Sequence, residues 1–91
     1  MTTSRLFLIT GVSSGFGRAL AEHALLAGHR VVGTVRNETA RHHFEALAPG
    51  RAFARLLEVT DAHAITALVA HIEADIGAID VLVNNAGYGH E

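Results

Sequence analysis

The sequence TGVSSGFG, residues Thr10–Gly17, decides how the rest of the chain is organised. It follows the apolar run Leu6–Ile9 and precedes Arg18–Glu22, so it joins a buried strand to a helix. A helix N-terminus has unpaired N–H groups and favours negative charge, so a glycine-rich turn at that place can hold phosphate. Glycines at positions 11, 15 and 17 would provide a tight turn, close approach of a pyrophosphate, and close packing of helix on strand. The spacing is GxxxGxG rather than GxGxxG, and a flexible turn without a ligand is the alternative that this motif alone leaves open.

The composition restricts the class of protein. A chain of 91 residues is at most one small domain, and 49% hydrophobic residues are enough for a core. The net charge of −2 gives no basic field for nucleic acid, so we expect no nucleic-acid partner. The sequence has no cysteine, no signal-peptide pattern and no apolar run long enough to cross a bilayer. We therefore expect a soluble, cytoplasmic protein without a membrane partner.

Strand and helix patterns alternate along the whole chain. Apolar runs predict strands at Leu6–Thr10, Arg30–Val35, Ala52–Val59 and Asp80–Asn84. Helical patterns cover Gly15–Ala27, Glu38–Leu47 and Thr60–Ile76, with Gly28 ending the first helix and Asp61 capping the third. Short connections between these elements predict an α/β fold, a doubly wound parallel sheet with the strand order 3-2-1-4. The ligand crevice of such a sheet lies outside the carboxyl ends of strands 1 and 4, where the glycine turn is.

The apolar faces of the helices predict how they cover the sheet. In the first helix Leu20, Ala24 and Ala27 share one face. The third helix has the most regular apolar stripe, formed by Ile65, Leu68, Val69, Ile72 and Ile76. Two helices would cover one face of the sheet and only one helix the other.

A second motif follows the fourth strand and reaches the same crevice. It is the sequence VNNAG, residues Val83–Gly87, which contains a pair of asparagines. With TGVSSGFG at the end of the first strand, it resembles the short-chain dehydrogenase/reductase family over essentially the whole chain. The resemblance implies a partial Rossmann-type fold in which residues 1–91 are the N-terminal part of one NAD(P)-binding domain. The catalytic C-terminal part of that domain is absent from these residues.

The resemblance also implies which residues bind the dinucleotide. The residues that would wrap the pyrophosphate are Gly11, Ser13, Ser14, Gly15, Phe16 and Gly17. Phe16 replaces a branched aliphatic residue common in the family, at a contact expected from the backbone. Glu58 and Val59 would lie beside the adenine, and Asn85, Ala86 and Gly87 would line the adenosine ribose and steady the sheet. For Asn84, pairing backbone groups at the strand end is an equal alternative.

The end of the second strand predicts which dinucleotide is bound. An acidic residue there would bind the 2′-hydroxyl of NAD, whereas an arginine accommodates the 2′-phosphate of NADP. This chain has Arg36 and no acid before Glu38, so we expect NADP rather than NAD. A hydrogen bond to a charged group contributes about 1.5–3 kcal/mol, enough to change the preference by one to two orders of magnitude. The alternative is that Arg36 is a solvated loop residue.

Catalysis in the family, as the resemblance implies it, uses a tyrosine of a YxxxK pair with a serine and an asparagine. The only tyrosine here is Tyr88, directly after NNAG, and the chain has no lysine. We therefore expect these residues to include no catalytic residue and to be inactive alone. The intact protein would be an oxidoreductase that interconverts a small-molecule carbonyl and an alcohol, and a homo-oligomer.

Of two other interpretations, one stays open and one is disfavoured. The open one is a stand-alone, non-catalytic module that binds a dinucleotide or another protein. The disfavoured one is a metal site, because His42 and His43 are adjacent, His63 and His71 are eight apart, and no HExxH spacing occurs.

Overall fold

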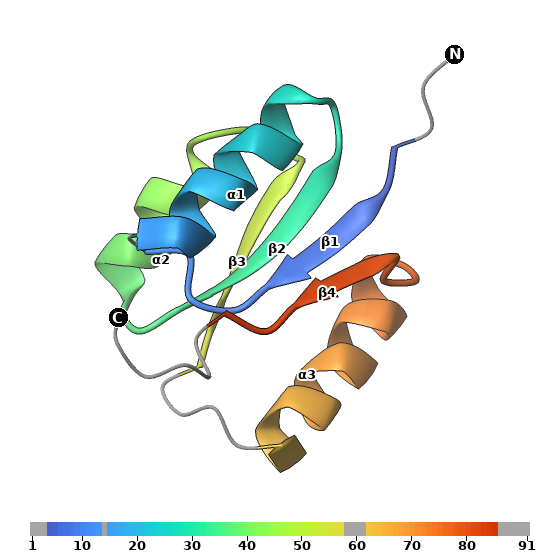
Figure 1. Ribbon diagram of the computed structural model, residues 1–91. Coiled ribbons are helices and arrows are strands. Elements are labelled where there is room, and N and C mark those ends of the chain that lie inside the picture. The colour runs from blue at the N-terminus through green and yellow to red at the C-terminus, as the bar shows by residue number, and fades with distance from the viewer. Residues whose placement is uncertain (1–3, 14, 58–61, 86–91) are drawn as a thin grey trace.

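The computed structural model describes residues 4–13, 15–57 and 62–85. These form a parallel sheet covered by helices on both faces (Figure 1). The strands are β1 (Leu6–Ile9), β2 (Arg30–Val35), β3 (Ala52–Leu56) and β4 (Val81–Val83), and the helices are α1 (Gly15–Leu26), α2 (Glu38–Glu45) and α3 (Ala62–Asp75). The strand order is β3-β2-β1-β4, as predicted. Among the helices of the described residues, none is long and apolar enough to cross a membrane.

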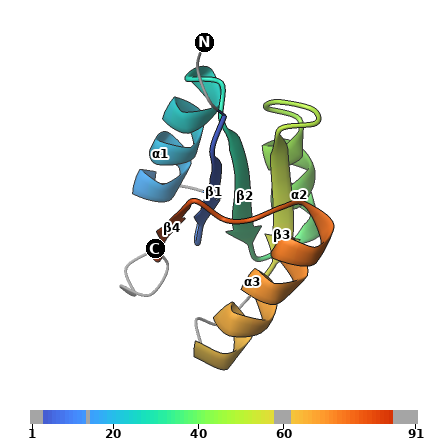
Figure 2. The ribbon, with the colours of Figure 1, turned by 90° about the vertical axis from the view of Figure 1, so that its right-hand side faces the viewer.

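Successive residues of each strand point to opposite faces of the sheet and fill two apolar clusters. On one face Ile9, Val31 and Ala54 pack with α1 and α2. On the other face Leu8 and Val32 pack around Ile72 of α3. Figures 1 and 2 show the same arrangement, with α1 and α2 on one side of the sheet and α3 on the other. The predicted division of two helices to one face and one helix to the other is confirmed.

The helix that follows the glycine turn ends where glycine allows it to end. Gly28 has φ +93°, a left-handed conformation that favours glycine. Its N–H donates to Leu25 O at 3.0 Å, and His29 N–H donates to Ala24 O at 3.1 Å. This pair of bonds is a Schellman motif, and it satisfies carbonyls at the helix end. The predicted inward position of Ala27 is wrong, because the chain has already left α1 there and the residue is exposed.

The face under α3 is covered less completely than the face under α1 and α2. Of the predicted stripe, Ile72 is fully buried, whereas Leu68, Val69 and Ile76 are only partly buried. Leu82 of β4, which pairs in register with Leu8, is 50% exposed on this face. The edge strand β4 therefore lacks cover on the α3 side within the described part of the chain.

Candidate functional site

The glycine turn lies at the carboxyl end of β1, the central strand between β2 and β4. Gly11 has φ +75° and Gly15 has φ +67°, conformations that side chains with a Cβ rarely adopt. The first lets the chain turn out of the sheet directly after Thr10, and the second starts α1. The turn thus places the N-terminus of α1 at the sheet edge predicted to hold a ligand.

Residues from the neighbouring strands hold this turn on both sides. The Gly11 N–H donates to the Thr34 hydroxyl at 2.8 Å, and the Val12 N–H donates to the Thr34 carbonyl at 3.0 Å. The side-chain amide of Asn85 donates to the Gly11 carbonyl at 3.2 Å. The peptide groups on either side of Gly11 are therefore fixed by β2 and by the segment after β4.

Close packing explains two more glycines. A Cβ on Gly17 would lie 2.0 Å from Gly11 O and 2.7 Å from the Asn85 amide nitrogen. A Cβ on Gly33 of β2 would lie 2.3 Å from a Val12 methyl group. The first turn of α1 thus rests directly on the glycine turn, and the Val12 side chain fills the space above β2.

The asparagines after β4 act differently from one another. Asn84 accepts a hydrogen bond from the Thr10 hydroxyl at 3.2 Å, so it contacts the end of β1. Asn85 contacts the glycine turn itself. The contact of Asn85 with a ribose stays a prediction.

The remaining predicted site residues divide into exposed ones and ones outside the described residues. Ser13 and Phe16 are exposed in or beside the turn, and the Phe16 side chain is 66% exposed. Arg36 is exposed directly after β2, on the edge where the carboxyl ends of the parallel strands meet. Outside the described residues lie Ser14, Glu58, Val59, Ala86 and Gly87, and also Tyr88.

Sequence reasoning missed Thr34 and Gly33. Thr34 is 2% exposed and lies among apolar residues of β2, and a buried hydroxyl there requires a hydrogen-bond partner. That requirement was the signal that could have identified it. The partner, 23 residues earlier in the chain, is not apparent from local sequence.

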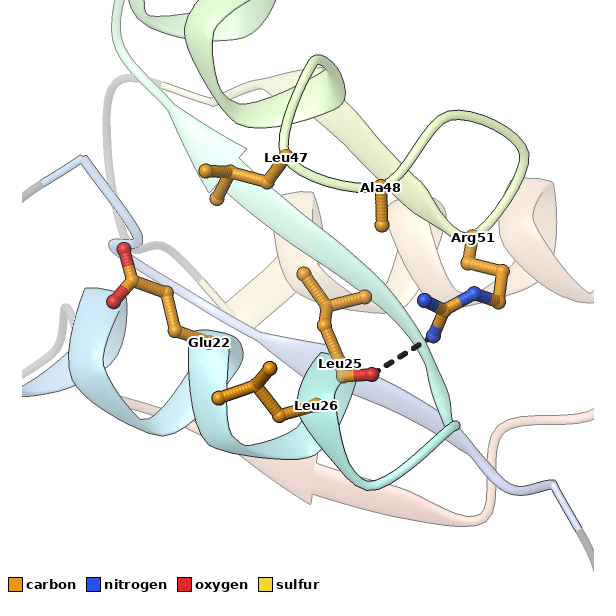
Figure 3. A pocket seen from close by; sticks show the side chains of 6 residues that line it. All are labelled: Glu22, Leu25, Leu26, Leu47, Ala48 and Arg51. Carbon is orange, nitrogen blue, oxygen red and sulfur yellow. Dashed lines mark hydrogen bonds between the residues drawn. The ribbon is translucent and has the colours of Figure 1, made fainter.

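A pocket of about 260 Å³ lies away from the glycine turn, at the amino edge of the sheet. Figure 3 shows Leu25 and Leu26 of α1 on one side and Leu47 and Ala48, which follow α2, on the other. Arg51 closes one end, where its guanidinium donates to the carbonyls of Leu25 at 2.9 Å and His29 at 3.1 Å. None of the predicted site residues lines this pocket. In the described part of the chain, no three His, Asp or Glu side chains are grouped so as to hold a metal ion.

Comparison with known proteins identifies relatives over nearly the whole chain. The family described as short chain dehydrogenase matches residues 5–91. The 3-oxoacyl-[acyl-carrier-protein] reductase FabG of Salmonella typhimurium is 36% identical over 83 residues, which are 91% of this chain and 34% of that protein. A probable NADP-dependent dehydrogenase of Dichelobacter nodosus is 45% identical over 83 residues, covering 90% of this chain and 77% of that protein.

Solved structures also have folds similar to that of this chain. A short-chain dehydrogenase from Streptomyces avermitilis has a TM-score of 0.84 and 46% identity, over 94% of this chain and 31% of that one. L-Sorbose reductase from Gluconobacter frateurii, complexed with NADPH and L-sorbose, has a TM-score of 0.74 and 29% identity, over 93% of this chain and 34% of that one. The chain spans about a third of the length of the FabG relatives and of these structures.

Proposed function

The chain belongs to the short-chain dehydrogenase family, and from that premise we propose that residues 1–91 are the N-terminal, NADP-binding part of one oxidoreductase domain. The observation that carries the proposal is the glycine turn at the end of β1, held by Thr34 and Asn85, with Arg36 after β2 at the same edge. This is the edge at which doubly wound sheets bind dinucleotides.

The residues at this edge fit a dinucleotide. Gly11 and Gly15 adopt left-handed conformations, and Gly17 allows no Cβ, so the backbone carries no side chain at these three positions. A pyrophosphate can approach such a backbone closely and accept hydrogen bonds from the N–H groups at the start of α1. The function of the chain's own residues is therefore to bind and orient the cofactor.

Arg36 supports NADP over NAD. Its side chain is exposed at the end of β2, and no acidic residue comes between β2 and Glu38. A planar guanidinium can bind a 2′-phosphate through two parallel hydrogen bonds. Two of the relatives are named for or complexed with this cofactor, the NADP-dependent dehydrogenase of Dichelobacter nodosus and the NADPH complex of L-sorbose reductase.

For the whole protein we propose hydride transfer between NADP(H) and a carbonyl or alcohol. The bound nicotinamide supplies the hydride, and the protein supplies its orientation and a path for the proton. The relatives named as 3-oxoacyl reductase and L-sorbose reductase carry names of this reaction class. Because the 91 residues contain no lysine, they cannot supply the tyrosine–lysine pair that the family resemblance implies. The chain alone would then bind cofactor without turnover, and the family also favours a cytoplasmic homo-oligomer for the whole protein.

The second candidate is a stand-alone module that binds a dinucleotide and has no catalytic role. It is favoured by one observation: among the described residues, Thr34 and Asn85 of this chain already hold the glycine turn. A steady-state assay separates the two candidates. Oxidation of NADPH in the presence of a carbonyl compound by the protein that carries these residues favours the reductase, and tight binding without any turnover favours the module.

Replacing Arg36 tests the cofactor assignment. We expect Arg36→Ala to weaken NADPH binding about 10- to 100-fold and NADH binding by less than about threefold, because only NADPH has the 2′-phosphate. Arg5→Ala removes the same charge at the opposite edge of the sheet and should change neither affinity. Isothermal titration of the three proteins with both nucleotides measures this. Equal losses for NADPH and NADH in Arg36→Ala would contradict the assignment to NADP.

A further inference from the structure

Thr34 is the buried polar residue of β2, and its hydroxyl and carbonyl both accept hydrogen bonds from the glycine turn. Its hydroxyl accepts the Gly11 N–H at 2.8 Å, and its carbonyl accepts the Val12 N–H at 3.0 Å. The residue is 2% exposed, so water does not readily replace either partner. Thr34 of the neighbouring strand therefore accepts hydrogen bonds from two successive N–H groups of the glycine turn.

The position of Gly11 matters because α1 rests on it. The Gly11 carbonyl is the atom that a Cβ on Gly17 would strike at 2.0 Å, and the Asn85 amide donates to that same carbonyl. A shift of the Gly11 peptide would therefore move the start of α1 or break the Asn85 contact. The Thr34 hydroxyl prevents that shift from the side opposite Asn85.

We propose that Thr34 is a positioning residue for dinucleotide binding: its hydroxyl fixes the Gly11 peptide and so sets the turn that receives the pyrophosphate. The inference rests on the proposed function for its ligand. Thr34 does not touch the cofactor and acts through Gly11. It lies two residues before Arg36, so the same strand end fixes the pyrophosphate turn and carries the residue for the 2′-phosphate. Thr34 serves NADPH and NADH alike, whereas Arg36 distinguishes them.

The test combines amide hydrogen exchange with cofactor titration in Thr34→Val, which keeps the shape and removes the hydroxyl, and in Thr34→Ser, which keeps the hydroxyl. Exchange of the Gly11 amide is compared within each protein with that of Val31 and Leu57, whose N–H groups donate to Arg51 O and Val35 O in the sheet. A control variant, Ile72→Val, shortens a buried side chain of α3 on the other face of the sheet.

In Thr34→Val we expect Gly11 exchange to rise about tenfold relative to the two sheet amides, and NADPH and NADH affinities to fall together by about three- to tenfold. Thr34→Ser should restore both, and Ile72→Val should leave both at the unmodified values. Equal acceleration of all three amides in Thr34→Val would overturn the inference, because Thr34 would then serve only global stability. Should that variant not fold, an unprotected Gly11 amide in the unmodified chain overturns the inference and a protected one supports it. Absence of nucleotide binding by the unmodified chain would contradict the proposal that these residues bind the cofactor on their own, and the exchange result would still decide whether Thr34 fixes the turn.

Discussion

Gly17→Ala has two opposing effects on stability: alanine favours the helix, and its Cβ clashes with the closely packed turn. Gly17 lies in the first turn of α1, outside the left-handed region, so alanine there would favour the helix by about 1 kcal/mol if space allowed. Space does not allow it, because the added Cβ would lie 2.0 Å from Gly11 O and 2.7 Å from the Asn85 amide nitrogen. The nearer atom belongs to a backbone that Thr34 and Asn85 hold in place.

The expected magnitude follows from these opposing effects. Overpacking of this kind costs about 1–3 kcal/mol, and loss of the Asn85–Gly11 hydrogen bond costs about 0.5–1.5 kcal/mol. After subtraction of the gain in helix propensity, the free energy of unfolding should fall by about 2 kcal/mol. For a domain of this size that lowers Tm by about 8–16 °C. NADPH affinity should fall as well, because α1 and the turn must move apart.

The assay is thermal unfolding followed by circular dichroism, together with NADPH titration below the transition. Gly28→Ala is the matched control: Gly28 has φ +93° and nothing within 4 Å of an added Cβ, so alanine there meets only backbone strain of about 1–2 kcal/mol. It should lose comparable stability and keep its NADPH affinity. A Gly17→Ala protein with a raised Tm, or with unchanged NADPH affinity, would refute the close-packing argument.

Two further predictions concern how the helices are fixed at their ends. Asn37→Ala should lower the free energy of unfolding by about 1 kcal/mol in urea denaturation, because the Asn37 side chain accepts the Ala40 N–H at 2.8 Å as the N-cap of α2. Asn37→Asp keeps an acceptor and should be nearly neutral, so equal losses in both variants would argue against capping. Arg51→Ala should cost about 1.5–3 kcal/mol in the same assay, because the guanidinium donates to two carbonyls near the end of α1. A loss below about 0.5 kcal/mol would mean that water replaces those contacts.

The strand order could be predicted from sequence because few arrangements satisfy the rules that govern it. The glycine turn fixed the first strand and helix, the alternation of patterns required parallel strands with right-handed crossovers, and the doubly wound arrangement has the order 3-2-1-4. Element ends were less predictable. The second helix was expected to reach Leu47 but ends at Glu45, because the Leu47 N–H donates to Phe44 O in a tighter turn. Leu47 lies outside the helix and is 40% exposed.

The candidate site was predictable where its residues are local and not where they meet across strands. Spacing identified Gly11, Gly15 and Gly17 because each lies within one strand–turn–helix unit. The contacts of Thr34 and Asn85 with Gly11 join residues 23 and 74 positions apart, and no local pattern encodes such pairs. Asn85 was included only through the family resemblance, as part of a segment that lines the ribose and steadies the sheet, and its bond to Gly11 was not predicted.

We propose that this chain binds NADP at the glycine turn. The decisive measurement is calorimetric titration of the purified 91-residue chain with NADPH and with NADH. Sedimentation of the same samples shows whether the binding species is a monomer or an assembly. We expect saturable binding of NADPH at least ten times tighter than binding of NADH. Equal affinity for the two nucleotides would contradict the role of Arg36. Absence of binding by a folded chain would contradict the assignment of the glycine turn as a site that these residues complete on their own.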